Sequence, residues 1–127
     1  MKDFDAHLIE LVEPIEHGEQ ENQPIAKVFA LNLNRDLLYF DGHFDDRPIL
    51  PAVAQLHLID RLVKAYFESD LMFSGMKQLK FMSPILPGQS TVLRIEEKKN
   101  NTFGFEFKTK ETVNAKGLLC YQGQDDD

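Results

Sequence analysis

One long, mostly apolar helical pattern occupies the middle of the chain, from about Pro51 to Phe67. At 100° per residue its apolar side chains spread over most of the helix circumference, so we expect a helix that is buried on most sides. A proline suits the first helical turn, where its missing N–H costs nothing. Gln55 falls inside the apolar arc and therefore needs a buried hydrogen-bond partner. The other polar side chains share one narrow arc, which contains His57, Asp60, Arg61 and Lys64.

Alternation of apolar and polar residues predicts strands on both sides of this helix. We expect two strands before the helix and four after it, over residues 7–16, 25–33, 76–82, 91–98, 103–108 and 115–121. Asn100-Asn101 is typical of a hairpin turn. This order indicates the α+β class. One helix cannot cover both faces of such a sheet, so the sheet must curve round the helix, and its other face or an edge must pack on another chain.

The totals indicate one domain over residues 1–127, in which about residues 123–127 form a disordered acidic tail. Hydrophobic residues make up 43% of the chain, which is enough for a core. A net charge of −7 argues against a nucleic-acid partner, because phosphate contacts need clustered Lys and Arg. An anionic small ligand needs only a local basic patch and stays open.

The chain contains no apolar run near the roughly 20 residues that a membrane span needs, so we expect no membrane span. Its first residues lack the basic start and apolar stretch of a signal peptide. Cys120 is the only cysteine, which excludes an intrachain disulfide and a cysteine-built metal site. We therefore expect a reducing, cytoplasmic compartment.

Chemically active side chains are concentrated just before the helix. His43 lies among Asp41, Asp45, Asp46 and Arg47, in a loop that Pro48 and Pro51 stiffen. This loop leads directly into the helix N-terminus, where unpaired N–H groups and the positive end of the helix dipole lie. A histidine beside such a terminus is suited to a reaction that develops an oxyanion.

Two motifs resemble a known family. The first, H-F-P-G-x-P-V/I-L/M/F-P-G-V, appears here as His43-Phe44-Asp45-Asp46-Arg47-Pro48-Ile49-Leu50-Pro51-Ala52-Val53. The second, F-x-x-P-V/I-x-P-G before a strand, appears as Phe81-Met82-Ser83-Pro84-Ile85-Leu86-Pro87-Gly88. With the matching order of elements, the chain resembles the hot-dog-fold (3R)-hydroxyacyl-acyl-carrier-protein dehydratases of fatty-acid synthesis and their relatives in polyene-type pathways.

The resemblance implies an antiparallel sheet wrapped round one long central helix, and a homodimer or an assembly of dimers with sites at the subunit interface. It implies reversible loss of water from a 3-hydroxyacyl thioester carried on acyl carrier protein or coenzyme A. No cofactor and no metal are implied. The loop histidine of one subunit would work with a carboxylate on the helix of the other.

This sequence departs from the family at three places. The position 14 residues after His43 holds His57 instead of a carboxylate, Ala52 replaces the glycine whose N–H is thought to polarise the thioester carbonyl, and Asp45-Asp46 replaces Pro-Gly. An alanine still offers that N–H if its φ is negative. We expect His43 to be the base, since histidine titrates near ~6.5.

Alternatives remain at the other positions. His57 acts as the acid or orients water, or it is a solvated histidine, while Asp60 is the second candidate for the missing acid. An acyl pocket would be lined by Phe44, Pro48, Ile49, Phe81 and Met82, unless these residues only fill the core.

Two other functions fit the same fold. A hot-dog thioesterase would use Asp41, Asp45 or Asp46 to activate water, and a binding module would hold acyl chains or carrier protein without catalysis. Docking of an acidic carrier protein would need a basic patch, for which the candidates are Arg47, Arg61, Lys64, Lys77 and Lys80.

Overall fold

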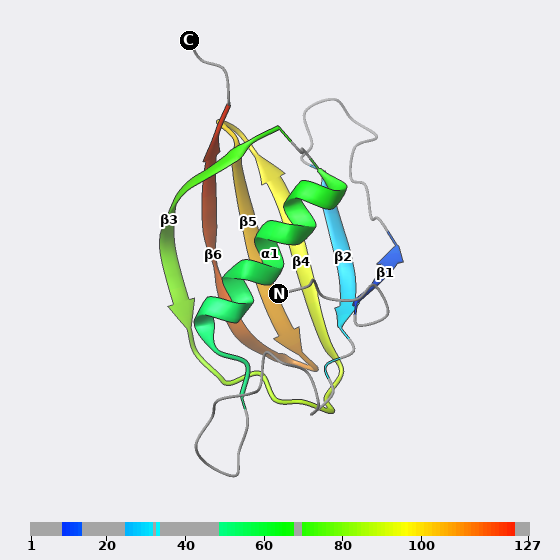
Figure 1. The fold of residues 1–127 in the computed structure, drawn as a ribbon. Helices are drawn as coiled ribbons and strands as arrows, with labels where there is room; N and C mark the ends of the chain where they lie inside the picture. Colours follow the sequence, from blue (N-terminus) through cyan, green and yellow to red (C-terminus); the bar gives the residue numbers. More distant parts are fainter. Residues whose placement is uncertain (1–8, 14–24, 32, 34–48, 68–69, 124–127) are drawn as a thin grey trace.

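The computed structural model describes residues 9–13, 25–31, 33, 49–67 and 70–123. One helix, α1 (Ala52–Tyr66), lies across one face of a single antiparallel sheet (Figure 1). The strands are β1 (Ile9–Glu13), β2 (Ala26–Leu31), β3 (Met72–Phe81), β4 (Thr91–Lys98), β5 (Thr102–Thr109) and β6 (Thr112–Gln122). Two strands, one helix and four strands follow one another as the pattern predicts, which confirms the hot-dog α+β fold.

The strand order in space is β1-β2-β4-β5-β6-β3. β3 is the first strand after the helix, yet it pairs with β6, the last strand, and forms one edge of the sheet. Asn100 (φ 59°) and Asn101 (φ 55°) occupy the left-handed region between β4 and β5, which confirms the predicted hairpin turn. The order therefore leaves β3 with one unpaired edge along ten residues.

β3 begins four residues earlier than its alternation predicts, because Gly75 interrupts the pattern but not the pairing. Its register with β6 shifts between Phe73 and Gly75 and again between Lys77 and Lys80. Such bulges let a strand absorb an extra residue while the ladder continues. β6 likewise extends beyond its predicted ends, over Thr112–Gln122.

The core fills the space between α1 and the sheet. The helix buries one stripe, formed by Ala54, Gln55, Leu58, Ile59, Leu62 and Val63, against inward side chains of the central strands such as Phe29, Leu93, Ile95 and Phe107. Burying each large side chain contributes about 1.5–3 kcal/mol. The prediction of burial on most sides is wrong for the single chain, because one sheet covers only one side of a helix; Val53 remains 77% exposed.

Gly117 on β6 has no room for a side chain. A Cβ atom at this position would lie 2.5 Å from Leu79 Cδ2 and 3.1 Å from Phe105 Cε2. The Phe105 ring and the Leu79 side chain therefore occupy the space that a side chain would need.

None of the helices in the described part of the chain is long and apolar enough to cross a membrane.

Candidate active site

The N-terminus of α1 carries backbone donors that no side chain of the described residues caps. Pro51 is the N-cap residue, extended at φ −68° and ψ 156°, and the first turn contains no acidic residue. The first intrahelical bond runs from the Gln55 N–H to the Pro51 carbonyl, at 3.0 Å. The N–H groups of Ala52, Val53 and Ala54 therefore have no acceptor within the helix. Such a terminus stabilises a negative charge that develops beside it.

Ala52 has the conformation that the expected role requires. It is the first residue of α1, so its φ is negative, and it is exposed. An alanine in this conformation presents the same N–H as a glycine. The change from the family's glycine therefore leaves the backbone donor in place.

The strand β3 ends at the same end of the sheet as the start of α1 (Figure 1). Phe81 and Met82, at the end of β3, are 45% and 51% exposed, and Ile49 is half-buried. These three are therefore not core residues of the single chain, and they leave apolar surface beside the helix N-terminus. The other two predicted pocket residues, Phe44 and Pro48, lie outside the described residues.

His57 is exposed on α1, on the side away from the buried stripe. It follows Ala52 by five residues, which is roughly 7.5 Å along the helix axis. His43 lies outside the described residues, as do Asp41, Asp45, Asp46 and Arg47. The meeting of two histidines therefore stays a prediction.

Asp60 uses both oxygens of its carboxylate within the fold. The Tyr121 hydroxyl donates to Oδ1 at 2.6 Å, and Lys64 Nζ lies 3.6 Å from Oδ2. Burial raises the pKa of Tyr121, and the hydrogen bond to Asp60 raises it further, so the phenol stays protonated. Asp60 follows Ala52 by eight residues, roughly 12 Å along the axis. Of the two candidates, His57 is therefore the nearer to the helix N-terminus along the axis.

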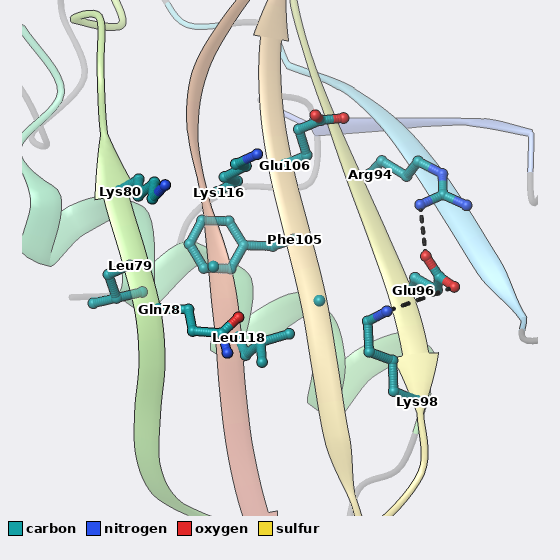
Figure 2. Close-up of a pocket in the computed structure, with 12 residues that line it drawn as sticks. Gln78, Leu79, Lys80, Arg94, Glu96, Lys98, Phe105, Glu106, Lys116 and Leu118 are labelled. Atoms are coloured by element: carbon teal, nitrogen blue, oxygen red, sulfur yellow. Dashed lines mark hydrogen bonds and ion pairs between the residues drawn. The ribbon is translucent and has the colours of Figure 1, made fainter.

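A depression of about 560 Å³ lies on the face of the sheet turned away from α1 (Figure 2). Arg94, Glu96 and Lys98 alternate along β4 with the buried Leu93 and Ile95, which assigns them to this outer face. The remaining charged lining residues are Lys80, Glu106 and Lys116.

Two ion pairs connect charged side chains of β4 on that outer face. Arg94 Nη1 lies 2.9 Å from Glu96 Oε1, and Lys98 Nζ lies 3.9 Å from Glu96 Oε2. The depression contains none of the predicted catalytic residues, and it lies on the opposite side of the sheet from Ala52. We therefore assign the candidate active site to the helix N-terminus and not to this depression on the outer face of the sheet.

Metal ligation has no support in the described part of the chain, where no group of three or more His, Cys, Asp or Glu side chains comes together.

The structure also joins two segments that sequence reasoning did not connect. The motif Pro-Ile-Leu-Pro occurs twice, at residues 48–51 and 84–87. The Leu50 N–H donates to the Ile85 carbonyl at 2.9 Å, so the second copy supports the first. The repeated tetrapeptide was the signal that could have indicated this contact.

Comparisons with known proteins give a family match and named relatives. The ApeI-like family, described as ApeI dehydratase, matches residues 17–118. The 3-hydroxyacyl-[acyl-carrier-protein] dehydratase FabZ of Erythrobacter litoralis is 27% identical over 115 residues, covering 84% of this chain and 72% of that relative. The FabZ of Clostridium perfringens is 34% identical over 94 residues, covering 68% of this chain and 66% of that relative.

Solved structures share the fold. The dehydratase heterocomplex ApeI:P from Xenorhabdus doucetiae gives a TM-score of 0.73 at 25% identity, covering 87% of this chain and 98% of that one. An uncharacterised protein from Erwinia carotovora gives a TM-score of 0.73 at 22% identity, covering 91% of each chain.

Proposed function

The chain belongs to the ApeI-like dehydratase family, and from this premise we propose that it removes water reversibly from a 3-hydroxyacyl thioester to give the enoyl thioester. The observation that carries the proposal is the uncapped start of α1, where exposed backbone donors lie at the apolar end of the sheet. An enolate oxygen needs such donors.

The proposed reaction assigns one group to each proton. Neutral His43 removes the proton from C2, and the electron pair of that C–H bond delocalises toward the thioester oxygen, where the Ala52 N–H donates. The pair then forms the C2–C3 double bond as the C3–O bond breaks. His57, as imidazolium, gives its proton to the departing hydroxyl, which leaves as water.

Two histidines can share this work because they differ in protonation. When two imidazoles lie close together, double protonation is disfavoured because the two positive charges repel each other. One then serves as the base while the other carries the proton. In this proposal His57 takes the place of the family's helix carboxylate, and its shorter distance from the start of α1 supports that choice over Asp60.

The same proposal includes a homodimer or an assembly of dimers. β3 has an unpaired edge, and its exposed apolar side chains are Met72, Phe73, Met76 and Phe81, with Met82 directly after it. A long apolar edge strand favours pairing with another chain. A second copy there would also cover the exposed Val53 side of α1. The measurement is the mass in solution, for which twice the 14.6 kDa of the chain or a multiple of that is expected.

We propose an acyl group on acyl carrier protein or coenzyme A as substrate, in the cytoplasm. The FabZ relatives are named for the carrier-bound form. Lys77 and Lys80 on β3 are exposed, and together with Lys64 and Arg61 on α1 they are the described candidates for contact with an acidic carrier. Arg47, the remaining candidate, lies outside the described residues.

One incubation tests the proposed function. The protein is mixed with a 3-hydroxyacyl thioester, and the enoyl absorbance and the free thiol are followed together. Enoyl absorbance without thiol is the expected result. Release of thiol would make the protein a thioesterase, and neither signal would make it a binding module; either outcome rejects the proposal.

A further inference from the structure

The buried glutamine, asparagine and threonine side chains among the described residues all belong to hydrogen bonds at one end of the sheet. Gln55, Thr91, Thr109 and Asn114 are 5%, 1%, 8% and 2% exposed. Burying polar groups is costly unless they are paired, so four such residues in one place require an explanation. They lie where β4 and β6 begin and β5 ends, at the same end as the start of α1 (Figure 1).

The sheet end of these bonds has a defined direction. Asn114 Oδ1 can only accept, so the Thr109 hydroxyl donates to it at 2.8 Å. The Thr109 hydroxyl has one proton, so at its 2.8 Å contact with Thr91 the Thr91 hydroxyl must be the donor. Asn114 is thereby fixed in one amide orientation, with its NH₂ group directed at the segment that follows β3.

Asn114 then holds that segment at several points. The backbone carbonyl of Asn114 accepts from the N–H groups of Met82 (2.8 Å) and Ser83 (3.1 Å). Its side-chain Nδ2 donates to the Pro84 carbonyl (3.1 Å). The next residue, Ile85, is fully buried. The segment is therefore fixed both by packing and by one asparagine.

Leu50 connects this segment to the helix. Its N–H donates to the Ile85 carbonyl at 2.9 Å, and its carbonyl accepts from Gln55 Nε2 at 3.0 Å. Leu50 is thus held on both sides of its backbone, two residues before Ala52. Gln55 Oε1 is buried and has no hydrogen-bond partner among the described residues. The side chain therefore leaves one polar atom unsatisfied while its NH₂ group holds Leu50.

We propose that Gln55 and Asn114 are positioning residues for the dehydration, a role that rests on the proposed function. They act through Leu50 and set the position of the Ala52 N–H relative to the sheet. A donor for an oxyanion must lie within a few tenths of an ångström of its working place. Misplacement by about 1 Å costs roughly 100-fold in rate, so a rigid link from the sheet to the helix start has a direct catalytic value.

The test uses Gln55→Leu, which is unusual in separating activity from stability. The substitution removes the unsatisfied Oε1 but leaves the Leu50 carbonyl unpaired, so one buried polar atom lacks a partner before and after. We expect an unchanged thermal midpoint within a few degrees, a kcat lowered about 10- to 100-fold and a similar KM. Leu62→Met, on the same buried stripe two turns further on, is the matched control and should keep its kcat.

Gln55→Glu adds a readout that a purely structural role would not produce. A protonated carboxyl can donate to the Leu50 carbonyl, whereas a carboxylate cannot. Burial raises the pKa of such a carboxyl, so the ratio of the variant's kcat to the wild-type kcat at the same pH should approach one at low pH and fall as pH rises through that pKa. Because the wild-type amide does not titrate, this ratio isolates the carboxyl from the pH dependence that both proteins share.

Amide hydrogen exchange separates this inference from the proposed function. In Gln55→Leu, hydrogen exchange at the backbone N–H groups of residues 50 and 55 should accelerate, while exchange in β5 stays unchanged. A protein without dehydratase activity would reject the proposed function, and the exchange data would still decide whether Gln55 holds the helix start. Unchanged exchange, or faster exchange with wild-type kcat, would overturn the positioning role.

Discussion

At the start of α1 the backbone donors have no side-chain acceptor among the described residues, whereas eight residues further along Asp60 has a partner on each carboxylate oxygen. Both regions belong to one helix. The first has unused hydrogen-bonding capacity beside exposed apolar side chains, and the second has spent its capacity on Tyr121 and Lys64. Chemistry on a substrate requires the first kind of region, and holding a helix to a sheet requires the second.

His43→Ala should give the largest effect. Loss of a general base lowers the rate by about 10²–10⁴-fold, so dehydration followed by enoyl absorbance should nearly vanish. The mass in solution and the thermal midpoint should stay at their wild-type values, since the change removes a loop side chain. Full activity in a folded variant would show that His43 is not the base, and the start of α1 would then no longer be supported as the catalytic region.

The pH dependence of kcat/KM should be the next largest effect. With His43 as the base and His57 as the acid, the rate needs one neutral and one protonated imidazole, so it should rise and then fall between about pH 5 and 8. His57→Ala should remove the falling limb. A profile that is flat across this range would contradict the shared role.

Tyr121→Phe should change stability more than activity. It removes the hydroxyl that donates to Asp60 and leaves the ring, so we expect a loss of about 1–2 kcal/mol in the free energy of unfolding, measured with denaturant. The kcat should stay within about twofold of wild type. A collapse of kcat would instead identify Asp60 as the acid and reverse the assignment of the two regions.

The smallest effect lies at alkaline pH. The pKa of Tyr121 is raised in the folded chain, so its contribution to stability is complete below the unfolded pKa, near 10, and is lost as pH rises above it. Unfolding free energies measured from pH 9 to 11 should therefore fall more steeply for the wild type than for Tyr121→Phe. Equal slopes would show that this phenol is not held protonated by the fold.

The sequence pattern predicted the order of the helix and strands, because the alternation and turn residues that define each element lie within that element. The strand over residues 91–98 and the turn at Asn100-Asn101 follow from alternation and from the tolerance of asparagine for positive φ. The need of Gln55 for a buried partner was also visible in the helix pattern, and Leu50 supplies that partner. These features depend on neighbours within a few residues.

The rest depends on which strands pair, which no local pattern contains. Asn114 meets the segment after β3 only because β6 pairs with β3, and Thr91 meets Thr109 only because β4 pairs with β5. Both networks were invisible in the sequence for this reason. Burial of α1 on most sides was wrong for the single chain because the apolar pattern does not say which chain provides the cover.

The absence of a side chain at Gly117 has a consequence for divergence within the family. A relative with even a methyl group at this position would have to turn Leu79 aside, because the two atoms would otherwise be 2.5 Å apart. Leu79 lies two residues before Phe81 on the edge strand, so that adjustment would reach the apolar end of the sheet from a distance. The apolar surface at the end of β3 can therefore diverge through a substitution on β6.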